Sequence, residues 1–143
     1  MEKKIVEVVA GVIYHNRRVL ACERPAGKKH AGKWEFPGGK IEKGETAAQA
    51  LMRELTEELA LKVSVLDEMY RLQLVQSDGS ELVLHFLRAV KSPASEPVSC
   101  ESQRFCWLEP DELYSVDWLE TDLEFVDFIA RGTSRMGCKT DKL

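Results

Sequence analysis

Short apolar stretches rich in β-branched residues alternate with polar turns along most of the chain. Residues 5–14 and 19–23 flank the polar sequence HNRR and predict an antiparallel hairpin. Residues 62–76 and 81–90 flank the turn sequence SDGS and predict a second hairpin. One further short strand is expected at 104–108. These stretches indicate a β-sheet as the framework of the chain.

The apolar spacing changes to steps of three and four residues after Thr46, which predicts a helix with one apolar stripe. Thr46 and Gln49 fit a capping box at the start of this helix. The stripe consists of Ala48, Leu51, Leu55 and Leu59.

A second helix is expected at 121–130, where Thr121 and Glu124 fit another capping box. The sequence PDELY, at 110–114, predicts a single helical turn before it. Residues 131–143 have no apolar period, so we expect them to form a disordered C-terminal tail.

The order of these elements favours an α+β fold. Strands before, between and after two helices predict a mixed sheet that the helices cover. The elements do not alternate regularly enough for a doubly wound fold. Because 143 residues are too few for two well-packed domains, a single domain over 1–130 is expected.

The composition narrows the function classes. A net charge of -4 argues against passive attraction to a nucleic-acid polymer or to an anionic membrane. No apolar stretch reaches the ~20 residues of a membrane-spanning helix. Glu7 interrupts the apolar N-terminal stretch and argues against a secretory signal. The four cysteines form no C-x-x-C pair, which indicates reduced thiols and a cytoplasmic protein.

Three acids lie within one turn of the first predicted helix. Glu54, Glu57 and Glu58 are three or four residues apart, so their carboxylates face the same side and repel one another. A divalent cation reverses the sign of that interaction, and Mg²⁺ or Mn²⁺ prefers such oxygen ligands. Helices rich in Glu and Arg are also common as plain solvated surfaces. The acids alone therefore leave metal binding open.

The wider spacing resembles the Nudix box, G-x5-E-x7-R-E-U-x-E-E-x-G-U, where U is aliphatic. The match runs from Gly39 through Glu45 to the segment 53–61, which reads RELTEELAL. The sequences WEFPGGKIE and TDLEFVDFI extend the resemblance to the MutT-like branch over about residues 4 to 130. One position departs, because Ala60 replaces the late glycine of the box. That replacement is costly only if the position requires a positive φ.

The resemblance implies a Nudix fold, in which a mixed sheet is packed between helices as an α/β/α sandwich. It also implies hydrolysis of a nucleoside triphosphate to a monophosphate and pyrophosphate with Mg²⁺, for which Mn²⁺ can substitute. The carried-over metal ligands are Gly38, Glu54, Glu57, Glu58 and Glu101. Glu54 also matches the general base, Arg53 would hold Glu54 in place, and Glu45 would be structural.

Six residues are expected to bind the nucleotide, and all of them except Lys40 lie outside the box. They are Arg24, Lys29, Trp34, Glu35, Lys40 and Asp122. The alternative interpretations are a solvated basic loop for Arg24 and Lys29, and a position capping the core for Trp34. Asp122 matches the position at which MutT-like enzymes read the base. An ionised carboxylate only accepts hydrogen bonds, so Asp122 favours a base with an exocyclic amine, such as cytosine. A simple role for this acid at the N-terminus of a helix is the competing interpretation.

Three functions remain open from the sequence. A hydrolase of cytidine-type or modified pyrimidine nucleotides leads, and an enzyme that clears 8-oxo-dGTP or other oxidised purine nucleotides is the first alternative. A non-catalytic nucleotide-binding module is the second, since a fold does not dictate activity. In each case the partner is a small nucleotide, and the protein is a monomer or a homodimer.

Overall fold

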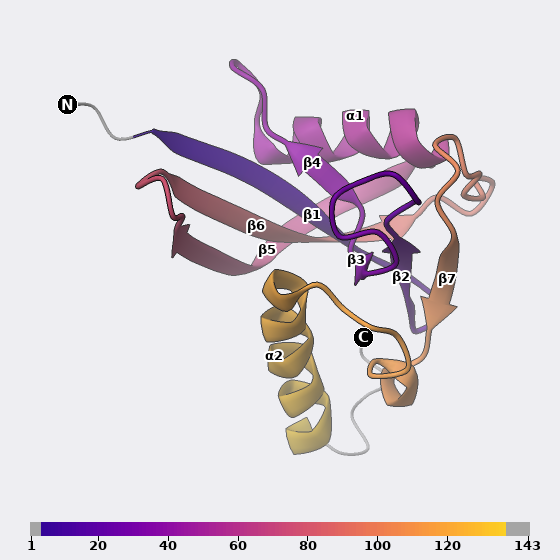
Figure 1. Ribbon diagram of the computed structural model, residues 1–143. Coiled ribbons are helices and arrows are strands. Elements are labelled where there is room, and N and C mark those ends of the chain that lie inside the picture. The colour runs from indigo at the N-terminus through magenta and orange to yellow at the C-terminus, as the bar shows by residue number, and fades with distance from the viewer. Residues whose placement is uncertain (1–3, 137–143) are drawn as a thin grey trace.

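The computed structural model describes the backbone of residues 4–136 and shows a sheet with one helix on each face (Figure 1). Helix α1 (Ala47–Leu59) covers one face, and helix α2 (Glu120–Met136) covers the other. This arrangement confirms the predicted α+β fold. Within the described residues, neither helix is long and apolar enough to cross a membrane.

The seven strands form one mixed sheet. Its main path runs β3-β2-β1-β6-β5, while β4 pairs with β1 and β7 pairs with β2. Both predicted hairpins are confirmed, because β1 pairs antiparallel with β2 and β5 pairs antiparallel with β6. The strands are β1 (Ile5–His15), β2 (Arg18–Glu23), β3 (Trp34–Glu35), β4 (Gly38–Lys40), β5 (Val63–Val75), β6 (Glu81–Lys91) and β7 (Phe105–Leu108).

Strand β1 lies at the centre of the sheet, and both of its faces are buried. Val9 and Ile13 pack into the cluster under α1, whereas Ala10 and Val12 pack into the cluster under α2. A strand covered on both faces carries a nearly continuous apolar sequence. Its parallel pairing with β6 brings together segments that the sequence leaves unconnected.

Helix α1 starts as predicted, since Thr46 and Gln49 form the complete capping box. Leu51, Leu55 and Leu59 are fully buried, as predicted. The alanine on this buried face is Ala50 rather than the predicted Ala48. The helix ends at Ala60, which adopts a left-handed conformation with φ of 49°.

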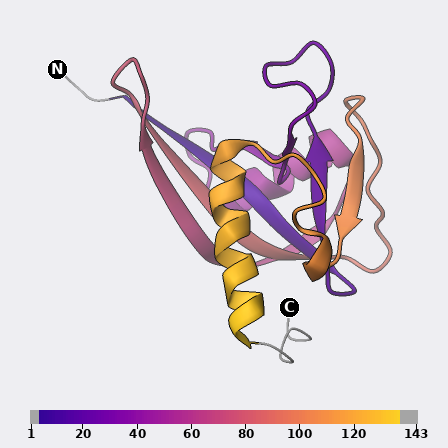
Figure 2. The ribbon, with the colours of Figure 1, turned by 60° about the horizontal axis from the view of Figure 1, so that its bottom comes forward.

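Helix α2 differs from its prediction at both ends. It begins at Glu120, so Thr121 lies inside the first turn and the predicted capping box with Glu124 is wrong. It continues to Met136, six residues past the expected end at Ala130. The disordered tail predicted for 131–143 is therefore wrong for 131–136, which are helical, and its remainder, 137–143, lies outside the described residues. Figure 2 shows this helix lying across the face of the sheet.

Aromatic packing fixes α2 on the sheet. Phe125 stacks on Phe86 of β6 with ring centroids 4.3 Å apart, and Phe36 stacks on Trp118 at 4.7 Å. Such pairs add stability beyond the burial of their area. The helical turn predicted at 110–114 is present as the short 3-10 helix η1 (Pro110–Glu112).

Candidate active site

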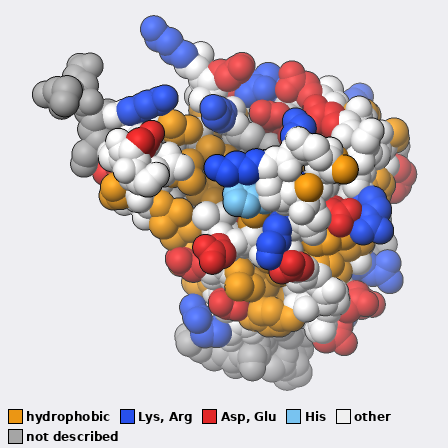
Figure 3. Space-filling model, viewed as in Figure 1, with side chains coloured by type: hydrophobic (Ala, Val, Ile, Leu, Met, Phe, Trp, Pro, Cys, Tyr) orange, Lys and Arg blue, Asp and Glu red, His pale blue; other side chains and the backbone are white. Residues whose placement is uncertain are grey.

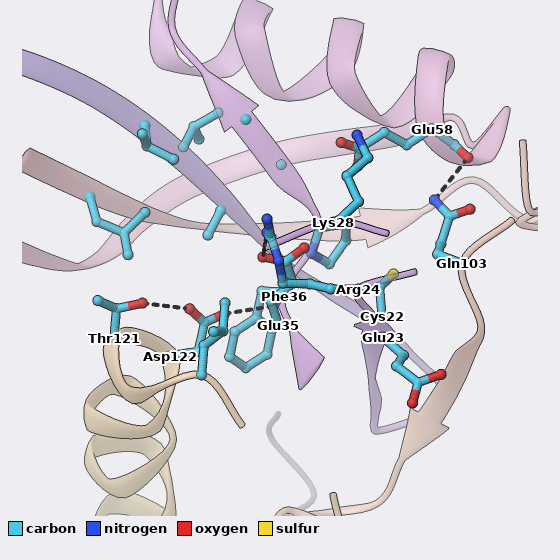
Figure 4. Close-up of a pocket in the computed structure, with 18 of the residues that line it drawn as sticks. Cys22, Glu23, Arg24, Lys28, Glu35, Phe36, Glu58, Gln103, Thr121 and Asp122 are labelled. Carbon is cyan, nitrogen blue, oxygen red and sulfur yellow. Dashed lines mark hydrogen bonds and ion pairs between the residues drawn. The ribbon is translucent and has the colours of Figure 1, made fainter. Parts of the chain in front are cut away.

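A cavity of about 290 Å³ opens between the C-terminal half of α1 and the first turn of α2. Figure 4 shows Glu58 on one side of this cavity and Asp122 on the other. Strands β1, β4 and β6 form the wall between them. The cavity therefore joins an acidic end to an end that is mostly apolar.

Burial and neighbouring acids raise the pKa of two carboxyl groups here, those of Glu58, which lines the cavity, and of Glu54, which lies one helical turn earlier and outside the lining. Burial, followed by Glu54 and Glu101, raises the pKa of the Glu58 carboxyl to about 8. Burial also raises the pKa of Glu54, with further contributions from Glu57 and Glu101. Closely spaced like charges disfavour ionisation of each carboxyl, so this end of the cavity favours a cation.

Two adjacent glycines let the backbone pass close to these acids. A Cβ atom at Gly38 would overlap the backbone of Val9, and a Cβ atom at Gly39 would overlap the Glu54 carboxylate. The backbone amide of Gly38 hydrogen-bonds to the Glu58 carboxyl and lowers its pKa, against the larger effect of burial. Close approach to backbone requires glycine at Gly38, whereas a Cβ atom at Gly39 would displace the Glu54 carboxylate.

Arg53 connects the helix to the segment that precedes it. Its guanidinium donates two hydrogen bonds to Glu45, at 2.7 and 3.0 Å, and one to the carbonyl of Lys40 at 3.0 Å. The same group is 3.5 Å from the Glu54 carboxylate and 3.1 Å from that of Glu57. Arg53 thus contacts Glu54, which it was expected to hold in place, and it contacts Glu57 as well.

The donor set fits a hard divalent cation. Glu54, Glu58 and Glu101 offer carboxylate oxygens, which Mg²⁺ and Mn²⁺ prefer. Glu57 is turned toward Arg53, and its side chain is 55% exposed. Within residues 4–136, no three His, Cys, Asp or Glu side chains already converge as metal ligands. The fit of this donor set to a divalent cation rests on the preference of such ions for carboxylate oxygens and on the close spacing of the acids.

Some of the basic residues near the site line the cavity, and others do not. Arg24 and Lys40 line the cavity, and Arg24 donates a hydrogen bond to Glu35 at 3.1 Å. Lys28 lines the cavity, whereas the predicted Lys29 does not and contributes only its carbonyl to Arg24. Nothing in the spacing of two neighbouring lysines distinguished them, because the turn of the loop decides which one faces inward.

Trp34 does not line the cavity. It packs partly buried against the core under α2, and the guanidinium carbon of Arg104 lies 6.0 Å from its ring centroid. Its backbone also bridges to Trp118. The structure therefore places this ring against the core and outside the lining of the cavity.

Asp122 is buried at the far end of the cavity, with 4% of its surface exposed. One carboxylate oxygen accepts a hydrogen bond from the Phe36 amide at 2.7 Å, and the other accepts one from the Thr121 hydroxyl at 3.1 Å. Burial raises the pKa of this carboxyl to about 7. Asp122 therefore changes protonation near neutral pH.

An apolar wall beside Asp122 was missed by the sequence analysis. It is formed by Val8, Ala10, Leu82, Leu84 and Leu119. Four of these residues are ordinary strand positions in the sequence, and only the pairing of β1 with β6 brings them together. The fifth, Leu119, directly precedes α2. In Figure 3, hydrophobic and cationic side chains meet near the middle of one face of the molecule. An apolar surface next to cations suits a ligand with a flat ring and a charged tail.

Comparison with known proteins identifies the family of the chain. A NUDIX domain model matches residues 5–128, so the chain belongs to the Nudix family. Within that family it is a MutT-like nucleotide pyrophosphohydrolase.

Its relatives are named for nucleotides with different bases. The chain is 33% identical over 135 residues to the CTP pyrophosphohydrolase of Escherichia coli, across 92% of this chain and 97% of that protein. It is 36% identical over 115 residues to the 8-oxo-dGTP diphosphatase of Haemophilus influenzae, across 79% and 82%. The solved structure of the Escherichia coli ORF135 protein matches with a TM-score of 0.78 and 32% identity, across 93% and 94%.

Proposed function

We propose that this protein hydrolyses a nucleoside triphosphate to a nucleoside monophosphate and pyrophosphate, with Mg²⁺ and with Mn²⁺ as its substitute. One observation carries the proposal. A single cavity has Glu58 and Glu101 at one end and Asp122 beside an apolar wall at the other. The acidic end suits a metal-bound polyphosphate, and the apolar end suits a base.

The chain's own groups divide the work of the reaction. Oxygens of Gly38, Glu54, Glu57, Glu58 and Glu101 would hold the metal. The bound ion would lower the pKa of a water molecule and offset the charge of the phosphates. Glu54 takes a proton from the attacking water, and Arg53 keeps its carboxylate in place.

The bond changes follow from water attack at the β-phosphorus. The water oxygen forms a bond to that phosphorus, and the bond from the β-phosphorus to the oxygen shared with the α-phosphate breaks. The nucleoside monophosphate leaves with that oxygen, and the other product is pyrophosphate. Arg24, Lys28 and Lys40 line the cavity as cations for the phosphates or the sugar. Lys29 contributes its carbonyl to Arg24 and so supports this group indirectly.

The base is read by Asp122 in this proposal, with cytidine-type or modified pyrimidine nucleotides as the leading substrates. An ionised carboxylate accepts a hydrogen bond from the exocyclic amine of cytosine. The raised pKa of Asp122 supports oxidised guanine nucleotides as the second candidate, because the neutral carboxyl also donates a hydrogen bond. Glu35 pairs with Arg24 and sets its direction at the edge of the cavity.

Pyrophosphate release from a panel of nucleotides tests the proposal. The panel contains CTP, dCTP, 5-methyl-dCTP, 8-oxo-dGTP, dATP and a nucleotide sugar, ranked by kcat/KM. We expect activity with Mg²⁺ or Mn²⁺ and none with EDTA. A protein that binds these nucleotides without releasing pyrophosphate would be a binding module, and the proposal would be wrong.

A matched pair of variants locates the metal requirement. Glu58→Gln removes a carboxylate of the cavity, so it should abolish the rise in thermal stability that Mg²⁺ gives the unchanged protein. Glu124→Gln alters an exposed acid that hydrogen-bonds to Tyr70 away from the cavity. This control should keep the full Mg²⁺-dependent stabilisation.

A further inference from the structure

Gln103 is a buried amide between the two walls of the acidic end, with 8% of its surface exposed. Its side-chain oxygen accepts a hydrogen bond from the backbone amide of Glu101 at 3.1 Å. Its side-chain nitrogen donates one to the backbone carbonyl of Glu58 at 3.3 Å, drawn as a dashed line in Figure 4. One side chain thus contacts the main chain of two acids that come from different segments.

We propose that Gln103 is a positioning residue that sets the distance and direction between Glu58 and Glu101 for the divalent cation. This inference rests on the proposed function, because it assigns Gln103 a part in the same metal site. Gln103 does not touch the metal or the nucleotide in this proposal. It acts through the two backbone groups that it connects.

The loop before β7 needs such a connection near Glu101. Its earlier part is docked by its backbone, since the amides of Val98 and Cys100 donate to the carbonyls of Leu59 and Glu58 at 2.7 and 3.0 Å. These carbonyls belong to the last turn of α1, where helical partners are lacking. Beyond Cys100 the chain turns through Ser102, which has a positive φ of 64°. The Gln103 amide fixes the Glu101 main chain within this turn.

Charge explains why an amide suits this position. Glu58 and Glu101 repel each other, which tends to move the loop away from α1. A neutral amide opposes that movement without adding a charge to the acidic end. The Ser99 hydroxyl lies 2.8 Å from the side-chain oxygen of Gln103 and 2.6 Å from its backbone carbonyl oxygen. This contact limits rotation of the side-chain amide.

The expected change in metal affinity follows from the positioning role of Gln103. Groups that orient metal ligands commonly change metal affinity by about 10- to 100-fold when they are removed. A displacement of about 1 Å at a reacting centre also lowers turnover strongly. Loss of the Gln103 amide should therefore weaken metal binding and reduce kcat, while KM for the nucleotide changes little.

The test measures Mn²⁺ affinity directly by electron paramagnetic resonance, with kcat and KM measured in parallel. Gln103→Met keeps the shape of the side chain and removes both hydrogen bonds. We expect it to raise the Kd for Mn²⁺ about tenfold and to lower kcat by a similar factor. Ser99→Ala, which frees the amide to rotate, should raise the Kd about twofold.

Gln49→Met is the matched control. Gln49 also hydrogen-bonds to the main chain, as part of the capping box, but it lies at the opposite end of α1. This variant should lower the thermal stability and leave the Kd for Mn²⁺ unchanged. A comparison with Gln103→Met separates lost stability from lost positioning.

A double-variant cycle tests whether Gln103 affects Mn²⁺ binding through Glu101. If Gln103 acts by placing Glu101, then Gln103→Met should weaken Mn²⁺ binding much less when Glu101→Gln is already present. Unchanged Kd values in both Gln103→Met and Ser99→Ala would overturn the inference, and so would full additivity in the cycle.

The outcomes also separate this inference from the proposed function. If the unchanged protein binds Mn²⁺ but hydrolyses no nucleotide of the panel, the proposed function is wrong, and the Kd values still decide the role of Gln103. If the unchanged protein hydrolyses nucleotides and Gln103→Met behaves like it in every measurement, only the inference is wrong. Absence of Mn²⁺ binding by the unchanged protein would overturn both.

Discussion

The guanidinium of Arg53 holds the carboxylate of Glu45 through two hydrogen bonds, at 2.7 and 3.0 Å. This interaction lowers the pKa of Glu45 to about 2, mainly because the hydrogen bond from Arg53 favours the ionised form. Glu45 in turn accepts a hydrogen bond from the Glu42 amide at 2.9 Å. The pair fixes the turn before α1, and Arg53 also stands beside the proposed base.

Arg53→Lys should separate the effect of the Arg53 hydrogen bonds from the effect of its positive charge. A lysine keeps one positive charge, but it cannot form the two-pronged contact with Glu45 and also reach the carbonyl of Lys40. We expect kcat to fall at least about tenfold, because Glu54 loses its fixed neighbour. Steady-state kinetics with the best nucleotide of the panel measures this change.

Arg71→Lys provides the control for that substitution. Arg71 pairs with Glu68 on β5 at 2.9 Å, away from the cavity. Its replacement should leave kcat and KM as they are. Equal effects of the two substitutions would contradict the role assigned to Arg53.

Glu54→Gln should lower kcat by about 10²- to 10⁴-fold, the usual contribution of a general base. The amide has nearly the same shape as the carboxyl, so circular dichroism and the unfolding midpoint should show an intact fold. Glu124→Gln, at the exposed acid that hydrogen-bonds to Tyr70 away from the cavity, should keep nearly full turnover. Near-normal hydrolysis by Glu54→Gln would refute the assignment of Glu54 as the base.

Asp122 should make the stability of the protein depend on pH. Because burial raises its pKa from an ordinary 3.8 to about 7, the folded state binds the proton more tightly than the unfolded state does. The resulting stability is fully present below about pH 4 and is lost as the pH rises through 7. The loss is on the order of 4 kcal/mol.

Asp122→Asn should remove this contribution, since the amide does not ionise and its oxygen can still accept the Phe36 hydrogen bond. Urea unfolding between pH 4 and pH 8 measures the free energy of unfolding of both proteins. Their difference isolates Asp122 from the other acids whose pKa is raised. A difference that stays constant over this range would show that Asp122 does not titrate there. The same variant should shift the substrate ranking toward purines.

Ala60→Gly should stabilise the protein by about 1 kcal/mol, because Ala60 has a left-handed conformation that disfavours a Cβ atom. Chemical denaturation should show a higher midpoint. Ala48→Gly, inside the same helix, should lower the stability by about 1 kcal/mol. If Ala60→Gly unfolds at the same denaturant concentration as the unchanged protein, the left-handed conformation carries no cost.

The sequence predicted the elements whose signals are local. The apolar period and the Thr46–Gln49 box marked α1, and the two hairpins were visible from their turns. The Nudix box identified the acids because its spacing lies on one helix. Arg53 could be placed next to Glu54 and Glu57 for the same reason.

Features built from distant segments could not be predicted in this way. The apolar wall depends on the parallel pairing of β1 with β6, and the inward position of Lys28 depends on the path of a loop. Gln103 gave no signal, because one glutamine in a polar loop resembles any other. Trp34 was expected at the nucleotide, but packing against the core under α2 decided its place.

The position of β1 has a consequence for biosynthesis. Its residues Ile5 to Tyr14 pair with β6 residues roughly 75 positions further along the chain, which favours slow folding. On the ribosome, β1 emerges long before its partner and has an open edge in the meantime. A translation product that stops before Glu81 would expose that apolar edge to other chains and would tend to aggregate.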